Sequence, residues 1–543
     1  MAQAEQRVDR RADYVVVGGG SAGCAVARRL AERGWSVVLI EAGRRDDRGP
    51  LKKLLSIPGA IAVMMSTPEL KQNFDWGYTS VPQENAWQRT IPQTRGRVLG
   101  GSSSINGMLF VRGNRKNFDD WAGEGCAGWS FEDVLPAFKR LEDWEGGASE
   151  LRGAGGPIHV RRHHTMTDAG RSFMEAVRTR LGVPRLDDYN AESQEGVSPF
   201  QLSADTGVRY SASKGYVRTD PPSNLTVLTE ATASRVVFAG SRATGVEVVG
   251  GNGSTVIRAS REVVLSAGVF GSPQLLMLSG IGPAEHLREH GIEARADLPV
   301  GDNLHDHLFV PVSFRMDSAL RKPTAPYFAR GLLREVLRPG SGWAAGSQFE
   351  ASGFVRTSRA GEIPDLQLLS LYWVYPVPNQ DSDKRVRPPT NKPGQSVFPA
   401  LIYPESRGTV RLRSADPLQA PLIDPAYLTA GEDTEVLLEG IRMVRETMAG
   451  IGDNQGEIGP GPEFADEREM RRVLPNFVHS VYHPVGTCRM GADERAVVDP
   501  NLKVRGIEGL RVADASIMPS ITGGNTNAPA IMIGERCARE ILS

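Results

Sequence analysis

The N-terminal part of the chain carries a regular succession of apolar and polar runs. The apolar residues 14–17 predict a buried strand. Small and apolar residues at near-helical spacing over 22–33 predict a helix that ends at Gly34. The next apolar run, 36–43, predicts a second strand that ends in Glu41. This strand–helix–strand order favours two parallel strands joined by a helix.

Later segments show the same two kinds of pattern. Residues 261–283 predict a strand, a turn of small residues and an apolar helix. Residues 509–542 predict a strand that ends near Asp514, a loop, and a closing helix from about Ala528. Short β-rich runs separated by glycine turns over 223–260 predict antiparallel strands. The chain therefore combines parallel strand–helix units with antiparallel runs, which favours an α/β fold.

Four further segments are less uniform. Residues 398–428 predict strands of a second sheet, and an amphipathic helix begins at Glu432. The apolar run 51–66 predicts a core or lid element, with a membrane-surface patch as the alternative. The charged, proline-rich run 381–396 predicts an exposed loop, with the rim of a site entrance as the alternative.

Composition narrows the class of protein. A chain of 543 residues is too long for one ordinary core, and 40% hydrophobic with 23% charged residues is typical of a globular protein. The net charge of −1 gives no basic excess for binding nucleic acid. No run of 18 apolar residues predicts a transmembrane helix. The four cysteines form no CxxC pair, which predicts neither a disulfide framework nor a zinc site and suits the cytoplasm.

The glycines after the first strand form the most informative motif. Gly18, Gly20 and Gly23 fit G-x-G-x-x-G between a predicted strand and a predicted helix. The first glycine permits the tight turn, the second lets a pyrophosphate approach the backbone, and the third lets helix and strand pack closely. Glu41 follows at the spacing of a carboxylate that accepts hydrogen bonds from a ribose. The motif predicts dinucleotide binding and does not separate FAD from NAD.

Four other segments resemble signatures of one enzyme family. They are "GRVLGGSSSINGMLFVRGN" at 96–114, "GSPQLLMLSGIG" at 271–282, "VGDNLHDH" at 300–307, and the C-terminal "YHPVGTCRMG…LRVADASIMP…GGNTNAP". By composition alone the first of these also suits an ordinary loop. Together they resemble the glucose–methanol–choline (GMC) oxidoreductases over nearly the whole chain, closest to the choline and alcohol dehydrogenase branch.

The resemblance implies a fold and a cofactor. It implies a Rossmann-like FAD-binding domain interwoven with an α+β substrate domain built on an antiparallel sheet. The FAD-binding domain is expected at about 12–160, 200–310 and 485–543, and the substrate domain at 161–199 and 311–484. The residues expected at the cofactor are Gly18, Gly20, Ser21, Gly23, Glu41, Gly100, Gly101, Ser102, Ser103, Asn106, Gly107, Ala233, Asp514, Asn525, Thr526 and Asn527.

The resemblance also implies two catalytic residues. The His-Pro-x-Gly-Thr loop places His483 beside the flavin, and the loop before the last helix supplies Asn525. Alcohol oxidation removes a hydroxyl proton while a hydride leaves for flavin N5, and a neutral imidazole is a suitable base. Asn525 is able to hold the substrate oxygen without titrating. In some choline-oxidising relatives a histidine bonds covalently to the flavin; Ile105 takes that place here, which predicts noncovalent FAD.

Several alternatives stay open at this point. A non-redox GMC activity, such as that of a hydroxynitrile lyase or a flavin photodecarboxylase, would use similar residues, and the bare glycine motif also suits an NAD(P)-linked dehydrogenase. The electron acceptor is O₂, a quinone or another carrier, and neither the alcohol nor the oligomeric state is indicated. His159, His163 and His164 lack metal-ligand spacing, so no metal is expected. His305 and His307 are interpreted as structural.

Overall fold

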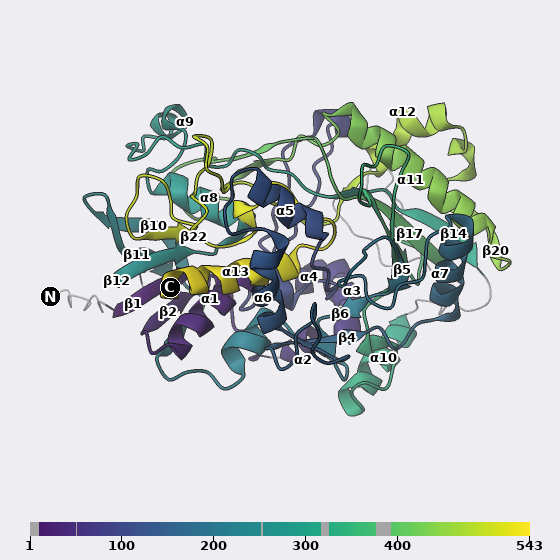
Figure 1. The fold of residues 1–543 in the computed structure, drawn as a ribbon, viewed down its shortest axis with the longest axis horizontal. Helices are drawn as coiled ribbons and strands as arrows, with labels where there is room; N and C mark the ends of the chain where they lie inside the picture. The colour runs from purple at the N-terminus through teal and green to yellow at the C-terminus, as the bar shows by residue number, and fades with distance from the viewer. Residues whose placement is uncertain (1–9, 50, 251–252, 317–324, 376–392) are drawn as a thin grey trace.

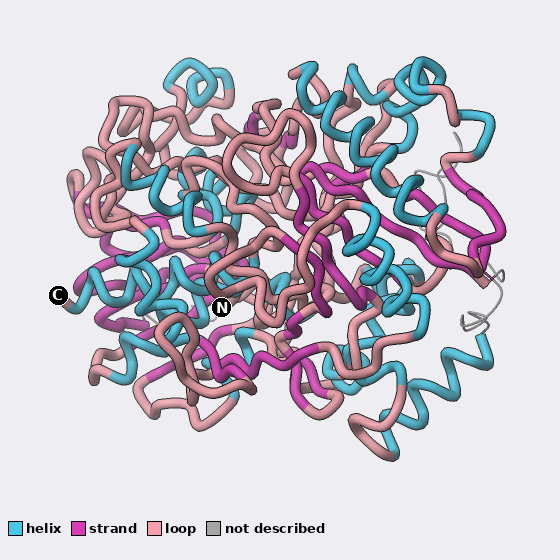
Figure 2. Tube along the Cα trace, turned by 45° about the vertical axis from the view of Figure 1, so that its right-hand side comes forward, coloured by secondary structure: helices cyan, strands magenta, loops and turns pink. Residues whose placement is uncertain are grey.

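The computed structural model describes residues 10–49, 51–250, 253–316, 325–375 and 393–543. Its strands form two large sheets, one of seven and one of eight strands, and three small ones. The seven-stranded sheet lies near the termini at the left of Figure 1, and the eight-stranded sheet lies at the right. The tube in Figure 2 shows the strands gathered in these separate groups, with helices and long loops around them.

The first sheet is built around the predicted N-terminal strand. β1 pairs in parallel with β2 on one side and with β12 on the other, while β9 continues the parallel set from β2 and β22 from β12. β10 and β11 add an antiparallel meander to β12. The bounds are β1 Arg10–Val17, β2 Val37–Ile40, β9 Leu225–Leu228, β10 Thr232–Ala239, β11 Arg242–Gly250, β12 Gly253–Leu265 and β22 Leu510–Val512.

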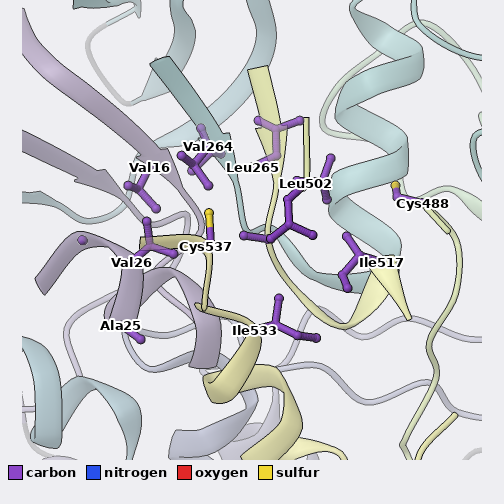
Figure 3. Packing of buried hydrophobic residues seen from close by; sticks show 14 of the residues in the cluster. Val16, Ala25, Val26, Val264, Leu265, Cys488, Leu502, Ile517, Ile533 and Cys537 are labelled. Atoms are coloured by element: carbon purple, nitrogen blue, oxygen red, sulfur yellow. The ribbon is translucent and has the colours of Figure 1, made fainter. Parts of the chain in front are cut away.

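Two helices from opposite ends of the chain pack together against this sheet. α1 (Ser21–Glu32) directly follows β1, and α13 (Asn527–Leu542) closes the chain beside it. A Cβ atom at Gly534 would lie 2.4 Å from the backbone oxygen of Ala22, so the two helices approach closely. Buried Val16, Val26 and Ile533 belong to the apolar core that joins them (Figure 3). The C-terminal loop is thereby fixed against the first glycine turn.

The second sheet forms the other half of the molecule. Its order is β20-β14-β17-β16-β15-β5, and β13 joins β17 to β21. The central strands β16 and β17 are fully buried, although each also carries a glutamine and a serine, and α7 and α11 pack against this sheet. The bounds are β5 Gly196–Pro199, β13 Leu308–Phe309, β14 Val312–Met316, β15 Phe349–Val355, β16 Leu366–Leu371, β17 Gly394–Leu401, β20 Asn454–Gly459, β21 His479–Ser480, α7 Asp168–Arg180 and α11 Gly431–Ala449.

The remaining elements connect or cover these two halves. The other helices are α2 Lys52–Ser56, α3 Ile61–Ser66, α4 Pro68–Lys71, α5 Arg115–Gly123, α6 Phe131–Leu141, α8 Gly268–Leu278, α9 Ala284–Glu289, α10 Ala325–Leu337 and α12 Glu467–Phe477. The other strands are β3 Glu142–Trp144, β4 Ile158–Arg162, β6 Gln201–Leu202, β7 Ala204–Asp205, β8 Val208–Arg209, β18 Thr409–Arg411 and β19 Leu422–Asp424. Within the described ranges, no helix is long and apolar enough to cross a membrane.

The pattern-based expectations hold with three differences. Of the strands predicted over 398–428, only β17 joins the large sheet, because β18 and β19 pair with each other as a separate ribbon. The region 223–260 is only partly antiparallel, because β9 lies parallel to β2 and β12 pairs in parallel with β1 as well as antiparallel with β11. The run 51–66 forms short helices with buried Leu55, Ile61 and Met64, which supports a core element. The predicted exposed loop 381–396 extends too far, because residues 394–396 already belong to the buried strand β17, whereas 381–392 lie outside the described residues.

Candidate active site

A cavity of about 740 Å³ lies between the two large sheets. Its lining includes residues at the carboxyl ends of four parallel strands: Gly18 directly after β1, Glu41 directly after β2, Ser266 directly after β12 and Asp514 two residues after β22. In parallel α/β sheets, ligands bind outside the carboxyl ends of the strands. The cavity therefore occupies the position where this fold binds a dinucleotide.

The first glycine turn has the geometry that its sequence predicts. Gly18 has a φ of 100°, which favours glycine, and a Cβ there would lie 2.3 Å from the backbone oxygen of Ser266. A Cβ at Gly20 would meet no atom within 4 Å, so this face of Gly20 is open to the cavity just before α1 begins. A helix N-terminus behind an open glycine turn is a suitable site for a pyrophosphate. Ser21 Oγ also donates a 2.7 Å hydrogen bond to Asn527 Oδ1, which connects this turn to α13.

Glu41 is buried at the end of β2. Its carboxylate accepts hydrogen bonds from the backbone N–H groups of Gly19 at 2.9 Å and Gly43 at 2.7 Å. Burial raises the pKa of Glu41 to about 7, against the opposing effect of these two bonds. The carboxylate thus holds the backbone around the glycine turn and also lines the cavity, where a ribose hydroxyl is able to donate to it.

The second glycine-rich segment packs directly on the first. Residues 101–104 form a short 3-10 helix, and a Cβ at Gly101 would lie 2.8 Å from Gly20 Cα. Asn106 lines the cavity, but its Oδ1 already accepts hydrogen bonds from Arg209 and from the Met108 N–H. Ile105 packs in a small apolar cluster at the cavity wall. The segment is therefore part of the wall of the cavity.

The predicted cofactor residues fall into two groups. Those that line the cavity are Gly18, Gly20, Ser21, Glu41, Gly101, Ser102, Asn106, Gly107, Ala233, Asp514, Asn525, Thr526 and Asn527. Gly23, Gly100 and Ser103 lie behind this lining. A Cβ at Gly23 would lie 2.0 Å from the Gly18 carbonyl oxygen, Gly100 donates to the Gly19 carbonyl, and Ser103 donates to the Gly100 carbonyl. These three residues shape the turns without facing the cavity.

The two predicted catalytic residues meet at the cavity wall. Asn525 Nδ2 lies 3.1 Å from His483 Nε2, and both residues line the cavity. On the other side of the ring, His483 Nδ1 lies 3.0 Å from Nδ1 of His307, whose Nε2 lies 2.9 Å from the carbonyl oxygen of Ile402. His307 was interpreted above as structural, and its direct contact with His483 was not predicted.

These contacts determine which nitrogen of each ring carries hydrogen. The Ile402 carbonyl only accepts, so His307 Nε2 donates to it and, in the neutral ring, Nδ1 is an acceptor. His483 then donates from Nδ1 to His307 and presents a bare Nε2 to the Asn525 amide. Burial lowers the pKa of His307 to about 3. Burial, with smaller effects of His307 and Arg95, also lowers the pKa of His483 well below its usual value, so its Nε2 is a free base near neutral pH.

The backbone of His483 is held by a buried carboxylate. Asp306 accepts hydrogen bonds from the His483 N–H at 2.8 Å, from Ser480 Oγ and from Tyr427 Oη. Burial raises the pKa of Asp306. "VGDNLHDH" thus supplies two residues, Asp306 and His307, that position the loop and the ring of His483.

The wall opposite the dinucleotide side comes from the second sheet. Leu369, Leu371, Trp373 and Tyr375 follow one another at every second position and all line the cavity, as expected for one face of a strand and its extension. Phe309, Phe349 and Phe398 complete this wall. The described residues 369–375 thus serve both as strand and strand extension in the second sheet and as cavity wall. The three phenylalanines were not predicted, because no motif marks residues that only the sheet brings together.

The sequence profile of the GMC oxidoreductases matches this chain twice. The N-terminal profile matches residues 12–309, and the C-terminal profile matches residues 404–534. The chain belongs to the GMC oxidoreductase family. It is 40% identical over 545 residues to oxygen-dependent choline dehydrogenases of Brucella suis biovar 1 (strain 1330) and of a Rhizobium etli strain. These matches cover 98% of this chain and 95% and 96% of the two relatives.

Solved structures support the same family at the level of the fold. A pyridoxine 4-oxidase from Mesorbium loti superimposes with a TM-score of 0.84 at 32% identity, covering 97% of this chain and 98% of that one. A formate oxidase from Aspergillus oryzae RIB40 superimposes with a TM-score of 0.87 at 28% identity, with 98% of both chains covered. As a GMC member this chain is a FAD-dependent oxidoreductase that acts on alcohols. The relatives named here offer no support for a lyase or a decarboxylase.

The geometry of the cavity lining is itself suited to FAD. Gly20 leaves open space at the start of α1, and Glu41 lies buried at the end of β2, as an adenosine diphosphate requires. The N-termini of α8 and α13 both line the cavity farther along. A helix N-terminus stabilises negative charge, including the charge that develops on a reduced flavin.

Proposed function

We propose that His483 is the base that removes the hydroxyl proton of a primary or secondary alcohol in this cavity. The observation that carries the proposal is the arrangement of His307, His483 and Asn525, which leaves His483 Nε2 unprotonated and directed at the cavity side. Bound FAD supplies the acceptor for the hydride that leaves the α-carbon. The alcohol thereby loses a proton and a hydride and becomes a carbonyl compound.

Asn525 has a different role in the same proposal. Its Nδ2 donates to His483 in the free protein, and the same amide is placed to donate to the substrate oxygen while the base removes the proton. This hydrogen bond stabilises the developing alkoxide where it forms, and such a bond is most useful in the transition state. Asn525 does not titrate, so its contribution is constant with pH.

Noncovalent retention of FAD belongs to the proposal as well. Ile105 lines the cavity and has no nucleophilic atom, so it cannot form a bond to the flavin ring. The turn around Gly20, the carboxylate of Glu41 and the N-terminus of α13 are proposed to hold the cofactor instead. Cytoplasmic location is retained as a proposal that rests on the scattered, buried free cysteines.

The names of the relatives suggest two kinds of substrate. The names of the 40% identical dehydrogenases suggest choline, a cationic alcohol. The name of the 32% identical oxidase suggests pyridoxine, an alcohol on an aromatic ring. Both are compatible with the proposed base. The description of the choline dehydrogenases as oxygen-dependent favours O₂ as the electron acceptor, with a quinone or another carrier as the alternative.

The experiment that tests the function is anaerobic flavin reduction. The purified holoenzyme is mixed with a panel of benzylic, aliphatic and cationic alcohols without O₂, and the flavin absorbance is followed. Bleaching by at least one alcohol, with recovery of the absorbance when O₂ is admitted, supports an alcohol oxidase. Bleaching without recovery in O₂ supports a dehydrogenase with another acceptor. A flavin that no alcohol bleaches would overturn the proposal.

A further inference from the structure

The substrate side of the cavity is a wall of packed rings. Phe309 stacks on Phe398 with ring centroids 4.3 Å apart, Tyr375 meets Phe398 edge-on at 5.1 Å, and Phe349 meets it edge-on at 5.8 Å. All four rings line the same cavity as His483. Phe349 also approaches the backbone of Gly107, in the loop that follows the second glycine turn. The ring wall therefore reaches from the second sheet to the residues expected beside the flavin.

The charges of the cavity lining are distributed unevenly. Two carboxylates belong to the described lining, Glu41 and Asp514, and each accepts backbone N–H groups at the dinucleotide end. Among the described residues no carboxylate lines the side that carries the rings. Two charged groups lie near the base: Arg95, which lines the cavity and donates to the Tyr482 carbonyl, and Asp306, which lies behind the lining and accepts from the His483 N–H. The described lining of the substrate side is thus apolar, with Arg95 at its edge and the nearest carboxylate behind it.

This distribution favours an uncharged substrate. A quaternary ammonium loses its hydration on entering the cavity, and the described lining of the ring side offers no carboxylate to compensate. Aromatic faces attract a cation, but the charged side chain in this part of the described lining is Arg95, and the carboxylate near it, Asp306, lies behind the lining. An uncharged ring loses little hydration and gains burial and edge-to-face contacts with the phenylalanines. The same rings therefore accept a neutral planar group more readily than a cation.

We propose that the substrate of this enzyme is an uncharged alcohol whose hydroxyl-bearing carbon is attached to a planar ring or to a short chain ending in one. This inference rests on the proposed function, because it places the substrate hydroxyl at His483. The proposed substrate differs in charge from choline, the cation in the names of the 40% identical relatives. Phe309, Phe349 and Phe398 are the residues that determine this specificity.

Two matched pairs of alcohols test the inference. Choline and 3,3-dimethylbutan-1-ol have the same shape and differ in charge, whereas 2-phenylethanol and 2-cyclohexylethanol have similar intrinsic reactivity and differ in ring planarity. Rates of anaerobic flavin reduction are measured for all four against concentration. We expect the limiting reduction rate divided by the apparent Kd to be at least about tenfold higher for 3,3-dimethylbutan-1-ol than for choline, and to be higher for 2-phenylethanol than for 2-cyclohexylethanol with most of that difference in Kd.

A substitution in the ring wall tests whether this wall causes the preference for a planar ring. Phe349→Leu keeps an apolar side chain and removes the ring, so it should lower the phenyl-to-cyclohexyl ratio relative to that of the wild type. Phe464→Leu removes a ring that lies outside the cavity lining and serves as the control. An unchanged ratio in Phe349→Leu would exclude this wall as the determinant of ring preference.

The outcomes separate this inference from the proposed function. Choline reducing the flavin faster than its neutral isostere would overturn the inference and leave the alcohol-oxidising function in place. Failure of all alcohols, including the wider panel described above, would overturn the function and the inference together. A preference for 3,3-dimethylbutan-1-ol over choline without a preference for the phenyl compound would support an uncharged substrate and overturn the inference that the substrate carries a planar ring.

Discussion

At the scale of single residues, the site depends on the protonation of one imidazole. His483 carries its hydrogen on Nδ1 because His307 is an acceptor there, and His307 is an acceptor because the Ile402 carbonyl fixes its own hydrogen on Nε2. Removing the base should therefore affect chemistry far more than cofactor binding. We expect His483→Gln to retain FAD and to reduce flavin about 10²- to 10⁴-fold more slowly in stopped-flow experiments.

The control for this variant is the exposed His164, which lies outside the cavity lining. His164→Gln should reduce flavin at the wild-type rate. If His483→Gln also reduces flavin at that rate, His483 is not the base.

The low pKa of His483 predicts a pH profile. Only the neutral ring accepts the proton, so the rate of flavin reduction is lost as the pH falls through the pKa of the folded protein. Burial lowers that pKa well below its usual value of 6.5. We expect the rate to be constant from about pH 9 down to about pH 6.5 and to fall only at lower pH. A midpoint at or above pH 6.5 in the rate profile would contradict a lowered pKa of His483.

Glu41 connects the backbone of the glycine turn to the cofactor. Glu41→Ala removes the acceptor of two backbone N–H groups and of the expected ribose bond, so FAD affinity should fall by about ten- to a hundredfold or more. Flavin content after dialysis measures the loss. Glu41→Gln keeps the shape and one acceptor oxygen and should lose less flavin. Equal flavin content in both variants and the wild type would mean that Glu41 does not contact the ribose.

At the scale of elements, the approach of α13 to α1 brings the last loop to the first turn. Asn525 lies two residues before the start of α13, so its position beside His483 depends on this packing. A Cβ at Gly534 would lie 2.4 Å from the Ala22 carbonyl oxygen, so Gly534→Ala pushes the two helices apart. We expect a loss of about 1–3 kcal/mol of stability together with weaker FAD retention, measured by thermal unfolding and flavin content.

A second helical glycine provides the control for this change. Gly123 is the last residue of α5, and a Cβ there meets no atom within 4 Å. Gly123→Ala should leave both the stability and the flavin content close to those of the wild type. If Gly534→Ala does the same, the helices have room to separate without disturbing the site.

At the scale of the whole molecule, the cofactor is expected to be enclosed without being bonded. The cavity runs from the carboxyl ends of the first sheet to the ring wall of the second, so unfolding removes every contact that holds the flavin. Acid precipitation should therefore release all of the yellow colour into the supernatant. A yellow pellet would show a covalent bond to the flavin and would contradict the interpretation of Ile105.

The sequence by itself determined the dinucleotide side of this protein. Local backbone geometry and residues close together in the chain determine the turn at Gly18 and Gly20, the helix that follows and the position of Glu41. These features can therefore be predicted from the order of the residues. His483 and Asn525 were identified from motifs that resemble a family, and their roles remain predictions. Ser103 and Gly100 show the limit even there, because the motif does not say which residues face the cavity.

Only the tertiary structure decided the substrate side. Phe309, Phe349 and Phe398 come from β13, β15 and β17, which become neighbours by strand pairing between distant segments. The contact of His307 with His483 joins residues from two segments that are likewise far apart in the chain. Such positions carry no local signal, because an apolar residue in a buried strand has the same pattern whether it faces a core or a cavity. Pairing and packing make that choice, and they form the ring wall on which the proposed preference for an uncharged ring rests.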